Sequence, residues 1–148
     1  MVSLLDVNLL IALAWPNHVH HRTALRWFDR NRKSGWATCP LTQSGFVRVS
    51  SNVHILPGAR SPREALALLR RIVGLPDHVF WQDDFSIATS DLVDETRLLG
   101  HRQITDAHVL AVALQHGGQL ATLDRGLTHL VPASHSAENA VHLVLDET

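Results

Sequence analysis

The chain has 148 residues, of which 45% are hydrophobic and 18% are charged, and its formal net charge is −1 at pH 7. This composition fits one soluble globular domain, 1–148, and it excludes a global electrostatic attraction to nucleic acid or to a membrane surface. No apolar stretch reaches the roughly 18–20 residues of a membrane span. The single cysteine, Cys39, excludes an intramolecular disulfide, and we expect a cytoplasmic protein.

Short apolar runs alternate along the chain with segments in which apolar residues recur at helical spacing. The short runs predict strands at residues 2–5, 36–39, 78–81, 119–123 and 140–145. The helical spacing predicts helices at residues 7–15, 21–33, 41–51, 62–73, 84–100 and 106–116. Apolar strands that alternate with helices are typical of a parallel sheet covered on both faces. The sequence therefore predicts an α/β fold with a central, mainly parallel sheet.

Cap and stop residues mark several predicted helix ends. Ser61 and Gly74 frame helix 62–73 as its N-cap and its C-terminal stop. Thr42 is the predicted cap of the preceding helix, and Gly100 is predicted to close the following one.

Three aspartates stand where apolar segments begin or end. Asp6 follows the first predicted strand, Asp124 follows the fourth, and Asp106 opens helix 106–116. Each has an ordinary structural explanation by itself, as a helix cap, a first-turn charge or a turn residue. The carboxyl ends of parallel strands meet at one edge of the sheet, and three caps have no reason to gather there. We therefore expect the three carboxylates to converge on one site.

Three carboxylates that lie together repel one another unless a positive charge lies between them. Oxygen donors with no cysteine or close histidine beside them favour Mg²⁺ or Mn²⁺ over zinc. A divalent ion held by a few carboxylates polarises a phosphate and lowers the pKa of a bound water. The predicted site is thus of the kind that hydrolyses phosphoesters.

Four segments of the chain resemble the successive motifs of the PIN-domain nucleases. They are LLDVNLLIALAW, CPLTQSGFVRVSS, QITDAHVLAVAL and ATLDRG, and they look most like the VapC-type toxins of bacterial toxin–antitoxin pairs. The resemblance implies a three-layer α/β/α domain and an endoribonuclease toxin that uses Mg²⁺ or Mn²⁺ to hydrolyse RNA phosphodiester bonds with an activated water. It also implies an RNA substrate, a cognate antitoxin protein and a homodimer, whereas no feature predicts a membrane partner.

The acidic positions of the family fall on four residues, for which the resemblance implies catalytic roles: Asp6, Asp106, Asp124 and Gln43. The three aspartates would also be the metal ligands. Four polar or basic residues lie near the acids in the sequence and are expected to bind substrate: Asn8, Thr122, Arg48 and Arg125. Gln43 is a departure, since the family often has Glu there and an amide brings no negative charge. It leaves open whether the site holds one ion or two.

The departure at Gln43 also leaves a second function open, a PIN-like module that binds RNA or an antitoxin but cuts weakly or not at all. Retention of the three aspartates favours the nuclease. Haloacid-dehalogenase-type phosphatases and phosphorelay receivers also begin with an acid after a first strand. Both need a second acid close to Asp6 and a lysine late in the chain, whereas the only lysine is Lys33, so we exclude them.

The histidines of the segment HVHH, at positions 18, 20 and 21, suggest a possible zinc site. No cysteine or carboxylate pattern completes such a site, and histidines at the start of a helix are more often surface residues. We therefore expect no zinc there.

Overall fold

A computed structural model describes residues 1–146 of the chain. Five strands form a sheet in the order β3-β2-β1-β4-β5, and every neighbouring pair is parallel. Their bounds are β1 Ser3–Leu5, β2 Trp36–Thr38, β3 His78–Phe80, β4 Gln119–Thr122 and β5 Val141–Leu143. All five lie within the predicted strands. Because β1 lies between β2 and β4, the residue that follows β1 stands at the middle of the carboxyl edge of the sheet.

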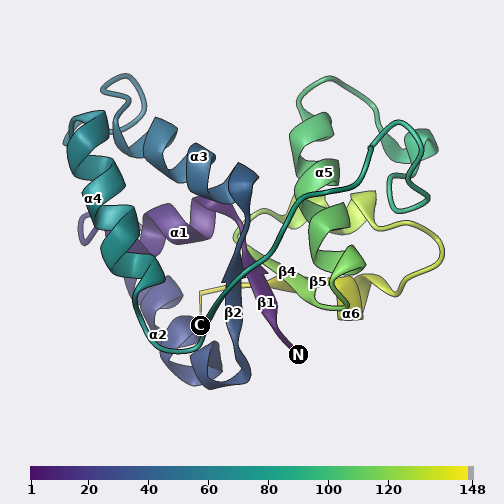
Figure 1. The fold of residues 1–148 in the computed structure, drawn as a ribbon, viewed down its shortest axis with the longest axis horizontal. Helices are drawn as coiled ribbons and strands as arrows, with labels where there is room; N and C mark the ends of the chain where they lie inside the picture. Colours follow the sequence, from purple (N-terminus) through teal and green to yellow (C-terminus); the bar gives the residue numbers. More distant parts are fainter. Residues whose placement is uncertain (147–148) are drawn as a thin grey trace.

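Helices cover both faces of the sheet, which gives the expected three layers (Figure 1). One face carries α1 Val7–Ala14, α2 His21–Asn31, α3 Pro40–Ser50 and α4 Pro62–Val73. The other face carries α5 Gln103–Gln115 and the short α6 Ala137–Ala140. The longest helix, α5, has an almost wholly apolar sequence, because it lies on the sheet with most of its surface buried.

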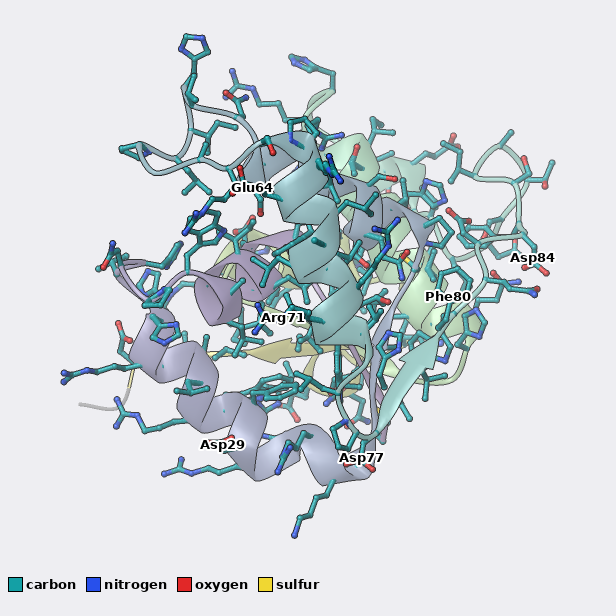
Figure 2. The ribbon with its side chains drawn as sticks, turned by 60° about the vertical axis from the view of Figure 1, so that its left-hand side comes forward. Asp29, Glu64, Arg71, Asp77, Phe80 and Asp84 are labelled. Carbon is teal, nitrogen blue, oxygen red and sulfur yellow. The ribbon has the colours of Figure 1, made fainter. Side chains whose placement is uncertain are left out.

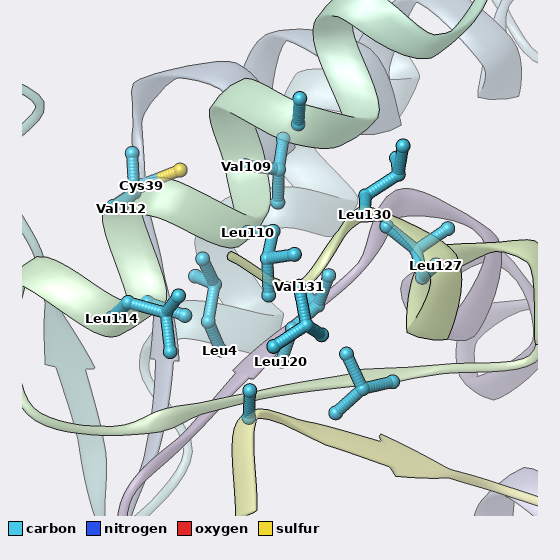
Figure 3. Close-up of a cluster of buried hydrophobic side chains, with 14 of the residues drawn as sticks. Leu4, Cys39, Val109, Leu110, Val112, Leu114, Leu120, Leu127, Leu130 and Val131 are labelled. Atoms are coloured by element: carbon cyan, nitrogen blue, oxygen red, sulfur yellow. The ribbon is translucent and has the colours of Figure 1, made fainter. Parts of the chain in front are cut away.

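Two apolar cores result, one on each face of the sheet. Successive strand residues point to opposite faces, so Leu4 packs beneath α5 whereas Leu5 packs against the helices of the other layer. Figure 3 shows the core beneath α5, where Leu4 and Leu120 of adjacent strands meet Leu110 of the helix. All three side chains are fully buried, and each stabilises the fold by about 1.5–3 kcal/mol.

The predicted ends of α4 are confirmed. The backbone N–H of Glu64 donates to the hydroxyl of Ser61 at 3.2 Å, and Gly74 is the C-cap. Figure 2 shows Glu64 near the start of this helix and Arg71 near its end, where a basic side chain complements the helix dipole.

Two other helix starts differ from the prediction. The N-cap of α3 is Cys39, and Thr42 lies three residues inside the helix, where its hydroxyl accepts a hydrogen bond from the backbone N–H of Cys39 at 3.0 Å. Pro40 starts the helix one residue earlier than expected, since proline is favoured at a first helical position. The α5 helix begins at Gln103, so Asp106 lies in its first turn instead of opening it.

The predicted helix at 84–100 is wrong. In its place the chain forms turns and one short 3₁₀ helix, η2 Glu95–Arg97. The side chains of Ser86, Ser90 and Asp94 each accept a hydrogen bond from the backbone N–H two residues later. Such local bonds compete with the backbone hydrogen bonds of a helix. Here they prevail, although the apolar residues recur at helical spacing.

This irregular segment is fastened to α5 by a charged hydrogen bond. The ring of His108 lies 2.9 Å and 3.0 Å from the two carboxylate oxygens of Asp83. Phe85 packs edge-on against the same ring, at 5.5 Å between centroids. The contact places the loop over α5 on the far side from α1 to α4.

The turn between α5 and β4 requires its two glycines. Gly117 has φ +71°, a conformation that other residues rarely adopt. A Cβ at Gly118 would lie 2.4 Å from the ring of Trp81 and 2.5 Å from the carbonyl oxygen of Val2. This close turn fixes where β4 begins, and Asp124 lies two residues after the end of β4.

In residues 1–146 no helix combines the length and apolarity needed to cross a bilayer.

Candidate active site

Asp6 follows β1 and is the most enclosed acid at the carboxyl edge of the sheet. Its backbone N–H continues the ladder with β4, donating to Ala121 at 2.9 Å. One carboxylate oxygen accepts from the N–H of Val7 at 2.8 Å, so Asp6 does cap α1. The other oxygen accepts from the hydroxyl of Thr122 at 2.7 Å. The structural interpretation of this residue as a helix cap is therefore confirmed, and the same carboxylate is also oriented from a neighbouring strand.

Thr122 connects the two strand ends on which the site is built. It is fully buried at the end of β4. Its hydroxyl donates to Asp6 and accepts from the side-chain amide of Asn8 at 3.2 Å and from the N–H of Asp124 at 3.1 Å. The amide oxygen of Asn8 in turn accepts from the N–H of Leu123 at 3.3 Å. Although we expected Thr122 to bind substrate, its burial and its three bonds make it a residue that orients Asp6.

Asp106 and Asp124 complete the group of carboxylates. Asp106 is half-buried in the first turn of α5, whereas Asp124 is exposed directly after β4. One oxygen of Asp124 accepts from the N–H of Gly126 at 2.8 Å, which is the turn expected for the sequence DRG. Both residues line one groove together with Asp6, as the sequence predicted, and this groove has a volume of about 450 Å³. We call it the carboxylate groove.

The carboxylate groove is lined by residues from both helical layers. Its polar members are the three aspartates, Asn8 and His18. Its apolar members are Val7, Ile11, Val49, Ile55 and Leu56. Within residues 1–146, no lysine or arginine contributes to the lining.

Burial and mutual repulsion disfavour the charged forms of two of these acids. Burial raises the pKa of Asp6, against the lowering effect of its hydrogen bonds to Thr122 and Val7, and the nearby Asp124 raises it further. Burial also raises the pKa of Asp106, to about 6, with added repulsion from Asp6 and Asp124. All three pairs of carboxylates therefore interact, and the cost of ionising them falls if a cation enters the groove.

The donor chemistry fits a hard divalent cation. Carboxylate and amide oxygens suit Mg²⁺ or Mn²⁺, and the hydrogen bonds to Asp6 leave each of its oxygens a further lone pair. In residues 1–146, no three His, Cys, Asp or Glu side chains lie together in a way that could by itself hold a metal ion. The three aspartates thus share the lining of one groove without forming such a group in the described structure.

Besides the buried Thr122, three of the residues expected at the site do not line the groove. Gln43 lies in the first turn of α3, where its amide N–H donates to the hydroxyl of Thr38 at 3.0 Å. Arg48 is exposed on α3, and Arg125 is exposed next to Asp124. The structure thus brings together Asp6, Asn8, Asp106 and Asp124, with Thr122 beneath them.

His18 is the polar lining residue that the sequence did not indicate. It comes from the loop between α1 and α2, which contributes no motif residue, and the spacing of HVHH gives no sign of which histidine faces the acids. Val49, Ile55 and Leu56 were missed for a similar reason, since apolar residues in a sequence give no signal that they border a groove.

Comparison with known proteins gives consistent matches over most of the chain. Residues 3–131 match the model of the PIN domain. Ribonuclease VapC39 of Mycobacterium tuberculosis is 45% identical over 127 residues, which cover 86% of this chain and 91% of that protein. Ribonuclease VapC38 of the same organism is 44% identical over 126 residues, which cover 85% and 87%.

Two solved structures share the fold. VapBC2 from Rickettsia felis, bound to a DNA fragment from its promoter, matches with a TM-score of 0.59 and 12% identity, covering 89% of this chain and 97% of that one. FitAB bound to the IR36 DNA fragment matches with a TM-score of 0.54 and 17% identity, covering 99% of each chain. At these identities the likeness concerns the arrangement of helices and strands alone.

Proposed function

This chain belongs to the PIN-domain family and is homologous to the VapC ribonucleases, and from that premise we propose that it is a metal-dependent endoribonuclease acting at the carboxylate groove. The observation that carries the proposal is the convergence of Asp6, Asp106 and Asp124 on one groove without a lysine or arginine in its described lining. Such a group of acids is tolerated when a divalent ion neutralises it.

Asp6 and Asp106 would hold one Mg²⁺ or Mn²⁺, with Asp124 bound to it directly or through a water. When bound, the ion supplies charge for the phosphate and lowers the pKa of the attacking water. The remaining groups of the site position these acids. The hydroxyl of Thr122 and the N–H of Val7 fix the two oxygens of Asp6. Fixed oxygens need no reorganisation when charge develops on the phosphate.

The proposed partners are an RNA substrate, an antitoxin that blocks the groove and a second copy of the chain. Support for the antitoxin comes from the fold, since the matching solved structures are the VapBC2 and FitAB assemblies. Residues 1–148 would act as one nuclease domain. Gln43 adds no charge to the groove, which supports one firmly held ion.

The test is cleavage of total cellular RNA by the purified chain, freed of any bound antitoxin, with Mg²⁺, with Mn²⁺ and with EDTA. Discrete fragments should form with either ion and disappear with EDTA or in the Asp106→Asn variant. Asp29→Asn is the matched control, because Asp29 is exposed on α2, outside the groove (Figure 2). A folded, metal-loaded protein that leaves all RNA intact would overturn the proposal and favour a binding module.

A further inference from the structure

His18 stands in the carboxylate groove with one ring nitrogen already fixed. Its Nδ1 accepts a hydrogen bond from the backbone N–H of His20 at 3.0 Å. Nδ1 is therefore unprotonated, and the neutral ring carries its proton on Nε2. The hydrogen bonds of residues 1–146 leave Nε2 without a partner. The Nε2–H of His18 is thus a hydrogen-bond donor in a groove whose other polar lining residues are three aspartates and Asn8.

The surroundings of His18 favour the neutral ring. Burial lowers the pKa of His18, and the nearby rings of His20 and His21 lower it further. Protonation would also place a second N–H against the backbone donor of His20. His18 can thus donate one hydrogen bond from Nε2 without bringing a positive charge to the groove.

The loop that carries His18 is held from three sides. The indole N–H of Trp15 donates to the hydroxyl of Ser50 on α3 at 3.3 Å. Nδ1–H of His21 donates to the carbonyl of Ala12 at 2.8 Å, and His20 lies 3.6 Å from the carboxylate of Asp146. These contacts account for the other two histidines of HVHH and fix the position of the first.

The groove also has apolar lining residues. Val49 lies near the end of α3, and the following loop supplies Ile55, which is 55% exposed, and Leu56. This loop is ordered by its own bonds, because the N–H groups of Ile55 and Leu56 both donate to the carbonyl of Asn52. The lining of the groove thus combines carboxylates with one imidazole ring and several aliphatic side chains.

An RNA strand has two kinds of group to place in such a groove. Its phosphates need a cation, and the described lining supplies none except at the proposed metal site. Its bases are flat and uncharged, carry acceptor atoms, and stack on histidine rings. The volume of about 450 Å³ lies in the range of small-molecule sites.

Resting on the proposed nuclease function, we propose that His18, with Ile55 and Leu56, forms the subsite for one nucleobase beside the scissile phosphate. The ring face stacks on the base, and Nε2–H donates to an acceptor on its edge. His18 is then a substrate-contacting residue that sets sequence preference and has no part in the proton transfers of the reaction.

The experiment sequences the ends that the chain produces from a pool of randomised single-stranded RNA, in parallel with KM and kcat measurements. The His18→Ala variant should lose about tenfold of the base preference at one position next to the cut and raise KM by a similar factor, with kcat little changed. His18→Phe should keep the KM and lose the preference, because it keeps the ring without the donor. His135→Ala is the control, since His135 is exposed outside the groove and its ring bonds to the adjacent Ser134.

An unchanged preference and KM in His18→Ala would overturn the subsite. If His18→Ala unfolds, His18→Phe and His18→Gln decide the question, since Gln keeps a donor at a similar reach. If the wild type cuts no RNA, the proposed function fails, and the subsite is judged from binding of fluorescent RNA homopolymers. Loss of base-dependent affinity in His18→Ala would then support the subsite on a binding module, and equal affinity would overturn it.

Discussion

Two buried threonines at the carboxyl edge of the sheet serve different chemistry. Thr122 ends β4 and Thr38 ends β2, on either side of β1, and both are fully buried. The hydroxyl of Thr122 donates to the carboxylate of Asp6. The hydroxyl of Thr38 accepts from Gln43 and lies 2.7 Å from Nε2 of His78. On one side of β1 a threonine hydroxyl thus binds a carboxylate. On the other side a threonine hydroxyl joins the side chains of Gln43 and His78, and we call this arrangement the neutral link.

The neutral link joins three side chains. The N–H of Gln43 donates to the hydroxyl of Thr38, and the direction of the bond between that hydroxyl and Nε2 of His78 is set by the tautomer of the ring. Burial lowers the pKa of His78, which agrees with a neutral ring. The comparison teaches that the threonine on the β1–β4 side orients a carboxylate of the groove, whereas the threonine on the β2–β3 side joins neutral side chains.

The largest effect is expected from removing a charge on the β1–β4 side. Asp6→Asn keeps the shape of the side chain and halves its capacity to accept hydrogen bonds and a cation. Cleavage of RNA should fall by roughly 100-fold to 1000-fold, since a divalent ion contributes several kcal/mol to transition-state stabilisation. Initial rates in Mn²⁺ check this, and a variant that cuts within threefold of the wild type would contradict it.

A matched pair of substitutions tests the comparison of the threonines itself. Thr122→Val and Thr38→Val each leave buried partners unpaired, so each should lower the free energy of unfolding by about 1–3 kcal/mol. Cleavage should fall about tenfold or more in Thr122→Val alone, because that variant frees the carboxylate of Asp6. Urea melts and initial rates measure the two effects. Equal loss of activity in both variants would show that the two sides of the edge do not differ.

Stability against pH should reveal the repulsion in the groove. The pKa of Asp106 is raised to about 6, so the folded state binds its proton more tightly than the unfolded state. The resulting contribution is fully present below about pH 4, and it is lost as pH rises through 6. In metal-free protein at pH 8, Asp106→Asn should therefore be more stable than the wild type by about 1–2 kcal/mol, allowing for solvent screening. Chemical melts from pH 4 to pH 8 measure this, and a variant less stable at pH 8 than the wild type would contradict it.

The smallest effect is expected from adding a charge on the β2–β3 side. Gln43→Glu restores the acid common in the family, and the new carboxylate can accept the proton of Thr38. Because Gln43 does not line the groove, cleavage should change by less than about threefold, below the scale of one ordinary hydrogen bond. A much larger increase in rate would show that this position reaches the ion during the reaction.

Sequence alone could predict the sheet, the layers and the three aspartates, because each depends on local periodicity or on the rule that parallel strand ends meet. The helix predicted at 84–100 failed because hydrogen bonds from Ser86, Ser90 and Asp94 compete with helical spacing. The cap at Asp6 did not exclude a place in the groove, since the same carboxylate caps α1 and lines the groove.

The surroundings of the acids depend on long-range contacts that no local pattern reports. The hydroxyl of Thr122 reaches Asp6 across 116 positions of sequence. The approach of His18 to the groove depends on how the α1–α2 loop is tied to α3. The motif led us to expect Gln43 at the site. Its hydrogen bond to Thr38, outside the lining of the groove, has no signal in the sequence.

The most direct test of the central claim is a Mn²⁺ titration of the purified, metal-free chain, followed by electron paramagnetic resonance of the free ion. The account predicts one firmly bound Mn²⁺ per chain, lost in Asp106→Asn and kept in Asp29→Asn. A wild type that binds no Mn²⁺, or an Asp106→Asn variant that binds it equally well, would contradict the claim that the three carboxylates share one metal site.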